Sequence, residues 1–342
     1  MSLCRIALLA AGIAVTVLTS ACGGKPAPPA GGHTAQRTVL CTTFPIFQIT
    51  RNVARGRDGL EVQLMLPSQL GCPHNYTLTP QDMQELARAD VLVINGLGME
   101  EFLGAPLKRA NEELTIVDSS AGIEETLQYT TDHEHEEGHE HNAGEAHKHH
   151  AGHDAEEGEE HDHHHHEGVN PHLFASPRMA AKLAMNIAAG LGKADPAGKD
   201  LYTRNARAYA ETLNKLADEM ADLGKRLKNN RIVEPHGVFD YLARDAGLEI
   251  LAVMQAHGQE PSAAEMARLA KTIREKKVGA IFTEPQYPDK VGKALARETG
   301  VPVGMLDPAA SGPEDAPPDY YETVMRENMK TLETTLGVKE VE

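Results

Sequence analysis

Five side chains that could bind a divalent metal stand singly in otherwise ordinary globular sequence. They lie at or near the ends of predicted strands, or in loops that follow strands: His74, His172, His236, Glu284 and Asp307. Three imidazoles and one carboxylate form an N₃O donor set that suits tetrahedral Zn²⁺. A lone histidine is more often structural than ligating, so it is their joint placement that indicates a metal site. Asp307 and Glu284 are the two candidates for the carboxylate.

A second group of histidines is concentrated in one acidic run, residues 132–166. The run holds 13 of the 18 histidines and 12 Asp or Glu residues against one Lys, so it carries −11 of the formal net charge of −17. It has no apolar residue larger than Ala and cannot bury enough surface to offset the entropy of ordering it. We therefore expect a solvated loop that collects metal weakly through imidazole. Its histidines are His133, His135, His139, His141, His147, His149, His150, His153, His161, His163, His164, His165 and His166.

Short apolar runs alternate with helical patterns on both sides of this loop, which predicts an α/β fold with two mainly parallel four-stranded sheets. The predicted strands are 39–43, 61–66, 91–95, 114–118, 231–233, 248–254, 278–283 and 301–306. Helices are expected at about 47–54, 80–89, 99–111, 176–189, 238–246, 262–276, 290–299 and 320–336. Open sheets of this kind bind ligands beyond the carboxyl ends of their strands, where the five side chains lie.

One helix is predicted to be much longer than the others. Larger apolar residues recur from Tyr202 to Leu227 at alternating steps of three and four, and residues 196–228 would span roughly 50 Å as a helix. That is too long for one small lobe, so we expect it to bridge two lobes. The predicted organisation is an N-terminal lobe at 38–192, in which 132–168 is the His-rich loop, then the bridging helix, then a C-terminal lobe at 229–342.

The N-terminal region reads as an export signal. Arg5 precedes a short apolar run, and small residues lead to Cys22, so residues 1–22 are a predicted signal peptide. Cys22 resembles a lipoprotein processing site, although Thr19 stands where Leu is usual. Residues 23–37, rich in Gly, Pro and Ala, are a predicted flexible tether.

Export to an oxidising compartment changes how the remaining cysteines are interpreted. Cys41 and Cys72 form an even pair, and we expect a disulfide between them. The alternative is that Cys72 and His74 form a Cys-x-His metal-binding pair. His257, in a predicted loop, is interpreted as a surface residue.

Several short motifs carry a family resemblance. They are residues 73–76 with 79–80, 170–172 with 176–177, 236–242, 259–262, 282–286 and 306–308. The chain resembles the zinc-specific solute-binding proteins of bacterial ABC transporters, in the group that includes the ZnuA, TroA and manganese-binding lipoproteins, over residues 39–336. The resemblance implies zinc in a cleft between lobes, bound by His74 and His172 from the first lobe and His236 from the second. Manganese members carry Glu at this third position, so His236 favours zinc. The fourth ligand varies within the family between a C-lobe Asp, a Glu and water, and Asp307 is the predicted fourth ligand here, with Glu284 as the alternative.

The same resemblance implies a non-enzymatic receptor that delivers Zn²⁺ to a permease in the cytoplasmic membrane. We expect an exported monomer, held at the membrane only by a lipid anchor. A zinc hydrolase, a zinc buffer and a manganese or iron receptor are the alternatives. The acidic composition excludes a basic nucleic-acid-binding surface, and outside the His-rich run no H-E-x-x-H signature is present.

Overall fold

The computed structural model describes residues 36–73, 76–104, 107, 110–129, 168–255 and 260–340. Within these residues two four-stranded parallel sheets form, with the strand orders β2-β1-β3-β4 and β6-β5-β7-β8. Both orders follow one plan, because the first strand of each half lies between the second and the third. The strands are β1 (Arg37–Cys41), β2 (Leu60–Leu64), β3 (Val91–Ile94), β4 (Thr115–Asp118), β5 (Arg231–Glu234), β6 (Glu249–Val253), β7 (Ala280–Thr283) and β8 (Val303–Met305).

Each sheet is covered by helices on both faces, as its apolar strands require. In β1, Val39 and Cys41 pack into one hydrophobic cluster while Leu40 packs into another, because successive side chains point to opposite faces. α1 (Phe44–Ala54) and α4 (Pro177–Ala194) lie against one face of the first sheet, and α2 (Pro80–Arg88) contacts its first strand. The predicted fold class is therefore confirmed.

The second sheet has an equivalent arrangement. α7 (Ala263–Glu275) and α8 (Lys290–Thr299) pack together and contact β6, β7 and β8. α6 (Asp240–Ala246) and α9 (Tyr320–Leu336) contact β6 and β8 respectively. Most predicted helix positions agree with these bounds, but within the helix predicted at 99–111 the described elements include only a 3₁₀ turn, Glu101–Leu103. α1 begins at Phe44 rather than at residue 47, because Pro45 is tolerated in a first helical turn.

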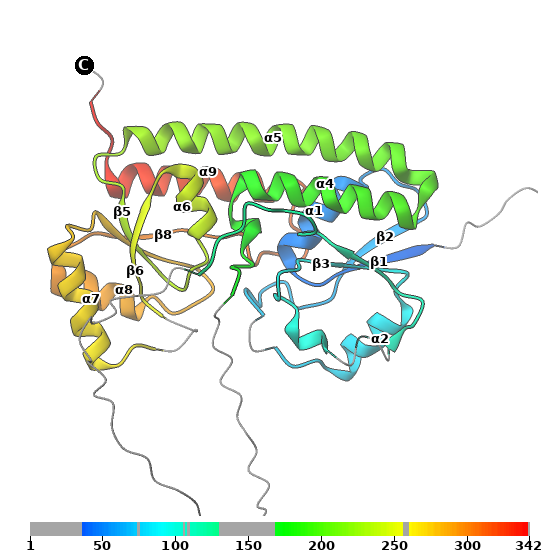
Figure 1. Ribbon diagram of the computed structural model, residues 1–342, viewed down its shortest axis with the longest axis horizontal. Coiled ribbons are helices and arrows are strands. Elements are labelled where there is room, and N and C mark those ends of the chain that lie inside the picture. The colour runs from blue at the N-terminus through cyan, green and yellow to red at the C-terminus, as the bar shows by residue number, and fades with distance from the viewer. Residues whose placement is uncertain are drawn as a thin grey trace, which may run out of the picture. The chain divides into compact units, whose positions relative to one another are not determined.

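The predicted bridging helix is α5 (Lys199–Arg226), 28 residues long and preceded by a 3₁₀ turn at Pro196–Gly198. It packs against α1 and α4 of the first half and against α6 and α9 of the second (Figure 1). Gly224 allows the approach to α6, since a Cβ there would lie 1.7 Å from the carbonyl oxygen of Ala246. α5 thus joins the two halves through a buried apolar stripe.

The loops that matter for function leave the carboxyl ends of the strands. The loop after β2 carries Cys72, the loop after β5 carries His236, and the residues after β7 and β8 include Glu284 and Asp307. No helix among the described residues combines the length and the apolar composition needed to cross a bilayer.

Candidate metal centre

The loop that follows β2 is anchored to the second half of the chain. The backbone N–H of Gly312 donates to the carbonyl of Ser68 at 3.0 Å, and Gln69 donates to the carbonyl of Gly312. Gly71 has a positive φ of 76°, and a Cβ there would lie 3.1 Å from Gln286, which follows β7. A glycine at this position therefore meets both the backbone conformation and the close approach, and it places Cys72 beside residues of the second half.

His172 is held by the residues on both sides of it. Asn170 Oδ1 accepts from the backbone N–H of His172 at 2.9 Å and lies 2.8 Å from its Nδ1. The amide nitrogen of Asn170 donates to the carbonyl of Gly237 and to Asp240, so its Oδ1 is the end that faces the imidazole. Nδ1 of His172 therefore carries the proton, and Nε2 is the nitrogen available for a metal.

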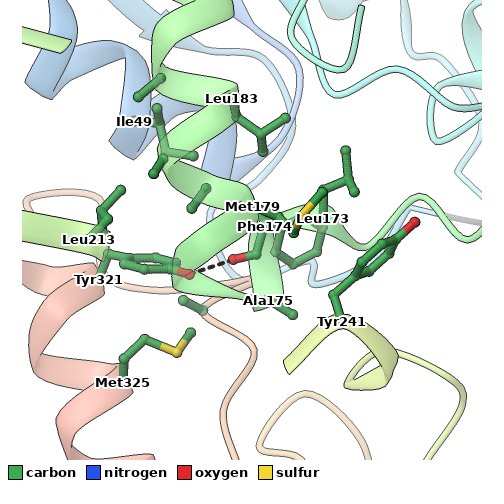
Figure 2. Packing of buried hydrophobic residues seen from close by; sticks show 14 of the residues in the cluster. Ile49, Leu173, Phe174, Ala175, Met179, Leu183, Leu213, Tyr241, Tyr321 and Met325 are labelled. Carbon is green, nitrogen blue, oxygen red and sulfur yellow. Dashed lines mark hydrogen bonds between the residues drawn. The ribbon is translucent and has the colours of Figure 1, made fainter. Parts of the chain in front are cut away.

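The turn after His172 fixes its backbone in the core. Leu173–Ala175 form a 3₁₀ turn whose three side chains are buried. The hydroxyl of Tyr321 donates to the carbonyl of Phe174 at 2.7 Å, and Figure 2 shows this bond between the turn and α9. The hydroxyl of Tyr241 on α6 donates to the carbonyl of Asn170 at 2.7 Å. Two helices of the second half thus hold the segment that carries a predicted ligand of the first.

His236 lies in the loop between β5 and α6 and is oriented by a carboxylate. Its Nδ1 is 2.7 Å from Oε1 of Glu284, and the two side chains are 8% and 1% exposed. A carboxylate on Nδ1 directs Nε2 toward a metal, in the arrangement common for ligating histidines. Glu284, which the sequence offered as an alternative fourth ligand, thus contacts the imidazole of His236.

The two imidazoles come together with a thiol. Ligand atoms of Cys72, His172 and His236 all lie within 4.8 Å of one another. The His172 and His236 rings meet edge to face, with centroids 5.4 Å apart, and Tyr129 and Tyr287 pack edge to face against one ring each. The three groups come from three separated loops, so the fold itself assembles the cluster.

The charges in this cluster favour a bound cation. Glu284 is almost fully buried, and no Lys or Arg in the described part of the chain forms a salt bridge with it. Burial and the Glu284 charge raise the pKa of Cys72 well above its usual value. A divalent cation would balance the carboxylate and stabilise a thiolate, which a protein without metal disfavours here.

Asp307 lies nearby but is not one of the three clustered residues. Its Oδ1 accepts from the backbone N–H of Ala309 at 2.8 Å and from Gln286 at 3.2 Å. Burial raises its pKa above the ordinary value, and the Glu284 charge adds to the shift. These contacts show a carboxylate that closes the turn after β8.

The predicted disulfide is absent, because Cys41 and Cys72 are both free thiols. Cys41 is fully buried in the core on β1, and burial raises its pKa to about 12. Cys72 lies instead with the two imidazoles. An even pair of cysteines in an exported chain does not by itself predict a disulfide, because the loop after β2 packs against the second half and carries Cys72 with it.

Several predicted residues lie outside the described residues. They are His74, His257, Cys22 and the thirteen histidines of residues 132–166. The sequence analysis missed the roles of Asn170 and Glu284 in orienting imidazoles. The role of Asn170 could have been predicted from the sequence. An Asn two residues before a His can accept a hydrogen bond from the backbone N–H of that His in an Asx turn.

The tyrosines beside the imidazoles were also missed. Tyr129 and Tyr287 come from loops remote in sequence from the histidines that they pack against. Nothing in the local sequence around either residue predicts that contact.

Comparison with known proteins gives related chains over nearly the whole length. The chain is 29% identical over 328 residues to the high-affinity zinc uptake system protein ZnuA of Bacillus subtilis, covering 94% of this chain and 95% of that one. It is 30% identical over 308 residues to the zinc-binding protein AdcA of Streptococcus pyogenes serotype M3, covering 88% of this chain. The chain spans only 56% of the length of that AdcA.

A solved structure shows the same fold. The SBP FpvC from Pseudomonas aeruginosa in complex with Mn²⁺ is 28% identical, with a TM-score of 0.69, over 88% of this chain and 98% of that one. The family model described as the periplasmic zinc-uptake complex component A, ZnuA, matches residues 39–335. That match covers most of the chain, which therefore belongs to the ZnuA family of zinc-uptake binding proteins.

Proposed function

We propose that this chain is the extracytoplasmic receptor of a zinc-uptake ABC transporter. It binds one Zn²⁺ between its two halves and delivers the ion to a permease in the cytoplasmic membrane. The proposed imidazole ligands are His74, His172 and His236. Zinc is the cargo in this scheme, and no chemical conversion takes place.

The single observation that carries the proposal is the pairing of two oriented imidazoles from opposite halves. Nδ1 of His172 lies 2.8 Å from Asn170 Oδ1, and Nδ1 of His236 lies 2.7 Å from Glu284 Oε1. In this orientation Nε2 is the nitrogen of each ring that would bind a metal, and the ring centroids are 5.4 Å apart. Such preorganised pairs are typical of metal sites.

The contacts of Asp307 and Glu284 help to decide which of them could be the fourth zinc ligand. Asp307, the residue predicted from sequence, has Oδ1 engaged by Ala309 and Gln286, and Glu284 is engaged by His236. Asp307 stays a prediction, and its substitution by Asn with unchanged zinc affinity would exclude it as a ligand.

Calorimetric titration of the metal-stripped protein with zinc tests the proposal. Wild type is expected to show one tight site, and His236→Ala to lose it while any weak sites remain. His257→Ala, at a predicted surface histidine, is the matched control and should keep the tight site. Only weak, multiple sites that are unchanged in His236→Ala would favour a zinc buffer and contradict a receptor.

Manganese is the second candidate cargo, because the 28% identical FpvC structure holds Mn²⁺. A site of three imidazoles is softer than the carboxylate-rich sites that suit manganese, so we expect it to bind Zn²⁺ more tightly than Mn²⁺. Competition titration with Mn²⁺ against bound Zn²⁺ measures the preference. Displacement of zinc by an equal concentration of Mn²⁺ would reverse the assignment.

Export, lipidation at Cys22 and a monomeric state belong to the same proposal. Export and lipidation are supported by the composition of residues 1–37, and export also by the periplasmic description of the family. The monomeric state stays a prediction. Mass spectrometry of the protein from a membrane fraction would detect a diacylglyceryl group on Cys22. A mature chain that begins elsewhere would contradict the anchor.

A further inference from the structure

We propose that Cys72 binds the zinc ion through its thiolate sulfur, beside the imidazoles of His172 and His236. The inference rests on the proposed function and names a ligand of the same site. It differs from the favoured sequence-based prediction, which paired Cys72 with Cys41 in a disulfide, and it takes up the alternative in which Cys72 binds metal.

The first argument is geometric. Zinc–ligand bonds of about 2.0–2.3 Å put tetrahedral ligand atoms roughly 3.4–3.6 Å apart. In the structure the sulfur and the two imidazole ligand atoms are within 4.8 Å of one another. Side-chain rotations that close the group by roughly 1 Å would bring these atoms to bonding positions around one ion.

The second argument concerns how Cys72 is held. Gly71 packs against Gln286, and the preceding loop is bonded to Gly312, so the segment is fixed to the second half on the side of His236. Cys41, the other cysteine described, is fully buried on β1 and is not part of the cluster. The thiol is thus positioned with the imidazoles and is not tied up in a disulfide.

The third argument is the charge around the thiol. Oε2 of Glu284 is buried and has no hydrogen-bond partner among the residues that the structure describes. That carboxylate contacts His236, which lies in the same cluster as Cys72, so a thiolate there would be a second anionic group near one metal position. A divalent cation satisfies both groups, and the thiol proton is released to solvent when the metal–sulfur bond forms.

A thiolate would change which metals the protein retains. Sulfur is a soft ligand that favours Zn²⁺ over Mn²⁺, which prefers carboxylate and water. Loss of a group that only hydrogen-bonds to a metal ligand weakens metal binding by roughly 10- to 100-fold. We therefore expect Cys72→Ser, which removes a ligand itself, to weaken zinc binding by at least this factor. Mn²⁺ binding should change much less, so the ratio of zinc to manganese affinity should fall.

Cobalt substitution provides the direct test, because a thiolate bonded to Co²⁺ gives a sulfur-to-metal charge-transfer absorption in the near ultraviolet. The full chain is stripped of metal, reduced and titrated with up to one equivalent of Co²⁺. The acidic His-rich run contains no cysteine, so cobalt held there cannot give this absorption. Wild type, Cys72→Ser and Cys41→Ala are compared, the last as the matched control for removal of a thiol.

The expected result is an absorption present in wild type and Cys41→Ala and lost in Cys72→Ser while cobalt stays bound. Stoichiometric cobalt binding without the absorption in wild type would overturn the sulfur ligand and leave the zinc receptor intact. Absence of any stoichiometric cobalt or zinc binding would overturn both the ligand and the proposed function.

A second measurement uses only the wild-type protein, so its result does not depend on whether a variant folds. In the wild-type protein, zinc at one equivalent should slow the reaction of Cys72 with a thiol reagent, while buried Cys41 does not react in either state. An unchanged rate of modification in the presence of bound zinc would contradict the proposal without any substitution.

Discussion

Two buried oxygen atoms lie against the imidazoles of the candidate metal centre. Asn170 Oδ1 holds Nδ1 of His172, and Glu284 Oε1 holds Nδ1 of His236. The amide of Asn170 is itself oriented, because its nitrogen donates to Gly237 and Asp240. Both rings are thereby preorganised, so a metal bound at the proposed site would not have to order them.

Glu284→Gln tests the role of this carboxylate. The amide keeps the shape but removes the charge that makes the imidazole of His236 a stronger donor to zinc. Zinc affinity is expected to fall by about 10- to 100-fold without loss of the one-to-one stoichiometry. Calorimetry measures both quantities.

Glu322→Gln, at a half-buried carboxylate on α9, is the matched control and should leave zinc affinity unchanged. Loss of the site altogether in Glu284→Gln would mean that Glu284 is itself a ligand. Unchanged affinity would mean that its contact with His236 is only structural.

At the scale of elements, a network at the carboxyl ends of β1 and β3 supports the segment that carries His172. The buried carboxylate of Glu100 accepts from Thr42 and from the backbone N–H groups of Asn95 and Gly96, at 2.7 to 3.0 Å. The amide of Asn95 in turn donates to the carbonyl of Pro171 at 2.9 Å. Burial raises the pKa of Glu100 to about 7.

This pKa predicts a pH-dependent stability. Because the folded protein binds the Glu100 proton more tightly than the unfolded chain, its contribution is full below about pH 4.5 and is lost as the pH rises through 7. Relative to Glu100→Gln, the free energy of unfolding of wild type should fall by up to about 3 kcal/mol between pH 4.5 and pH 8. Urea unfolding of both proteins across this range measures the difference.

Glu61→Gln, at an exposed carboxylate on β2, is the control and should follow wild type at every pH. A constant difference between wild type and Glu100→Gln would show that Glu100 ionises normally in the folded protein.

At the scale of the whole molecule, the halves are joined by more than α5. Tyr241, Tyr321 and Asp245 of the second half bond to the segment from Asn170 to Ser176. Arg51 of α1 donates to the carbonyl of Ala316 at 2.9 Å. These contacts between the halves, together with a stiff bridging helix, favour a small rearrangement on binding at the proposed site over a wide hinge motion.

Deletion of residues 132–166 tests whether the proposed site binds zinc tightly while the His-rich run binds it only weakly. One tight zinc site should remain with unchanged affinity, and only weak sites should disappear, because the residues of the clustered site lie outside the deleted run. Calorimetry at excess zinc resolves both classes. Loss of the tight site in the deletion variant would place it within the run.

The sequence alone determined the architecture of this protein. Apolar periodicity predicted eight strands and a helix long enough to serve both halves, because hydrophobic spacing is a local property. The residues around His172 and His236 also predicted a metal site, since loops after parallel strands converge.

Only the tertiary structure decided which atoms meet at that site. The contact of Glu284 with His236, the free thiol of Cys72 and its approach to His172 all join segments far apart in the chain. Such contacts depend on how the loop after β2 packs against Gln286 and Gly312, which no local pattern encodes. Strand and helix formation follow from near neighbours, whereas a ligand set is selected by the packing of remote loops.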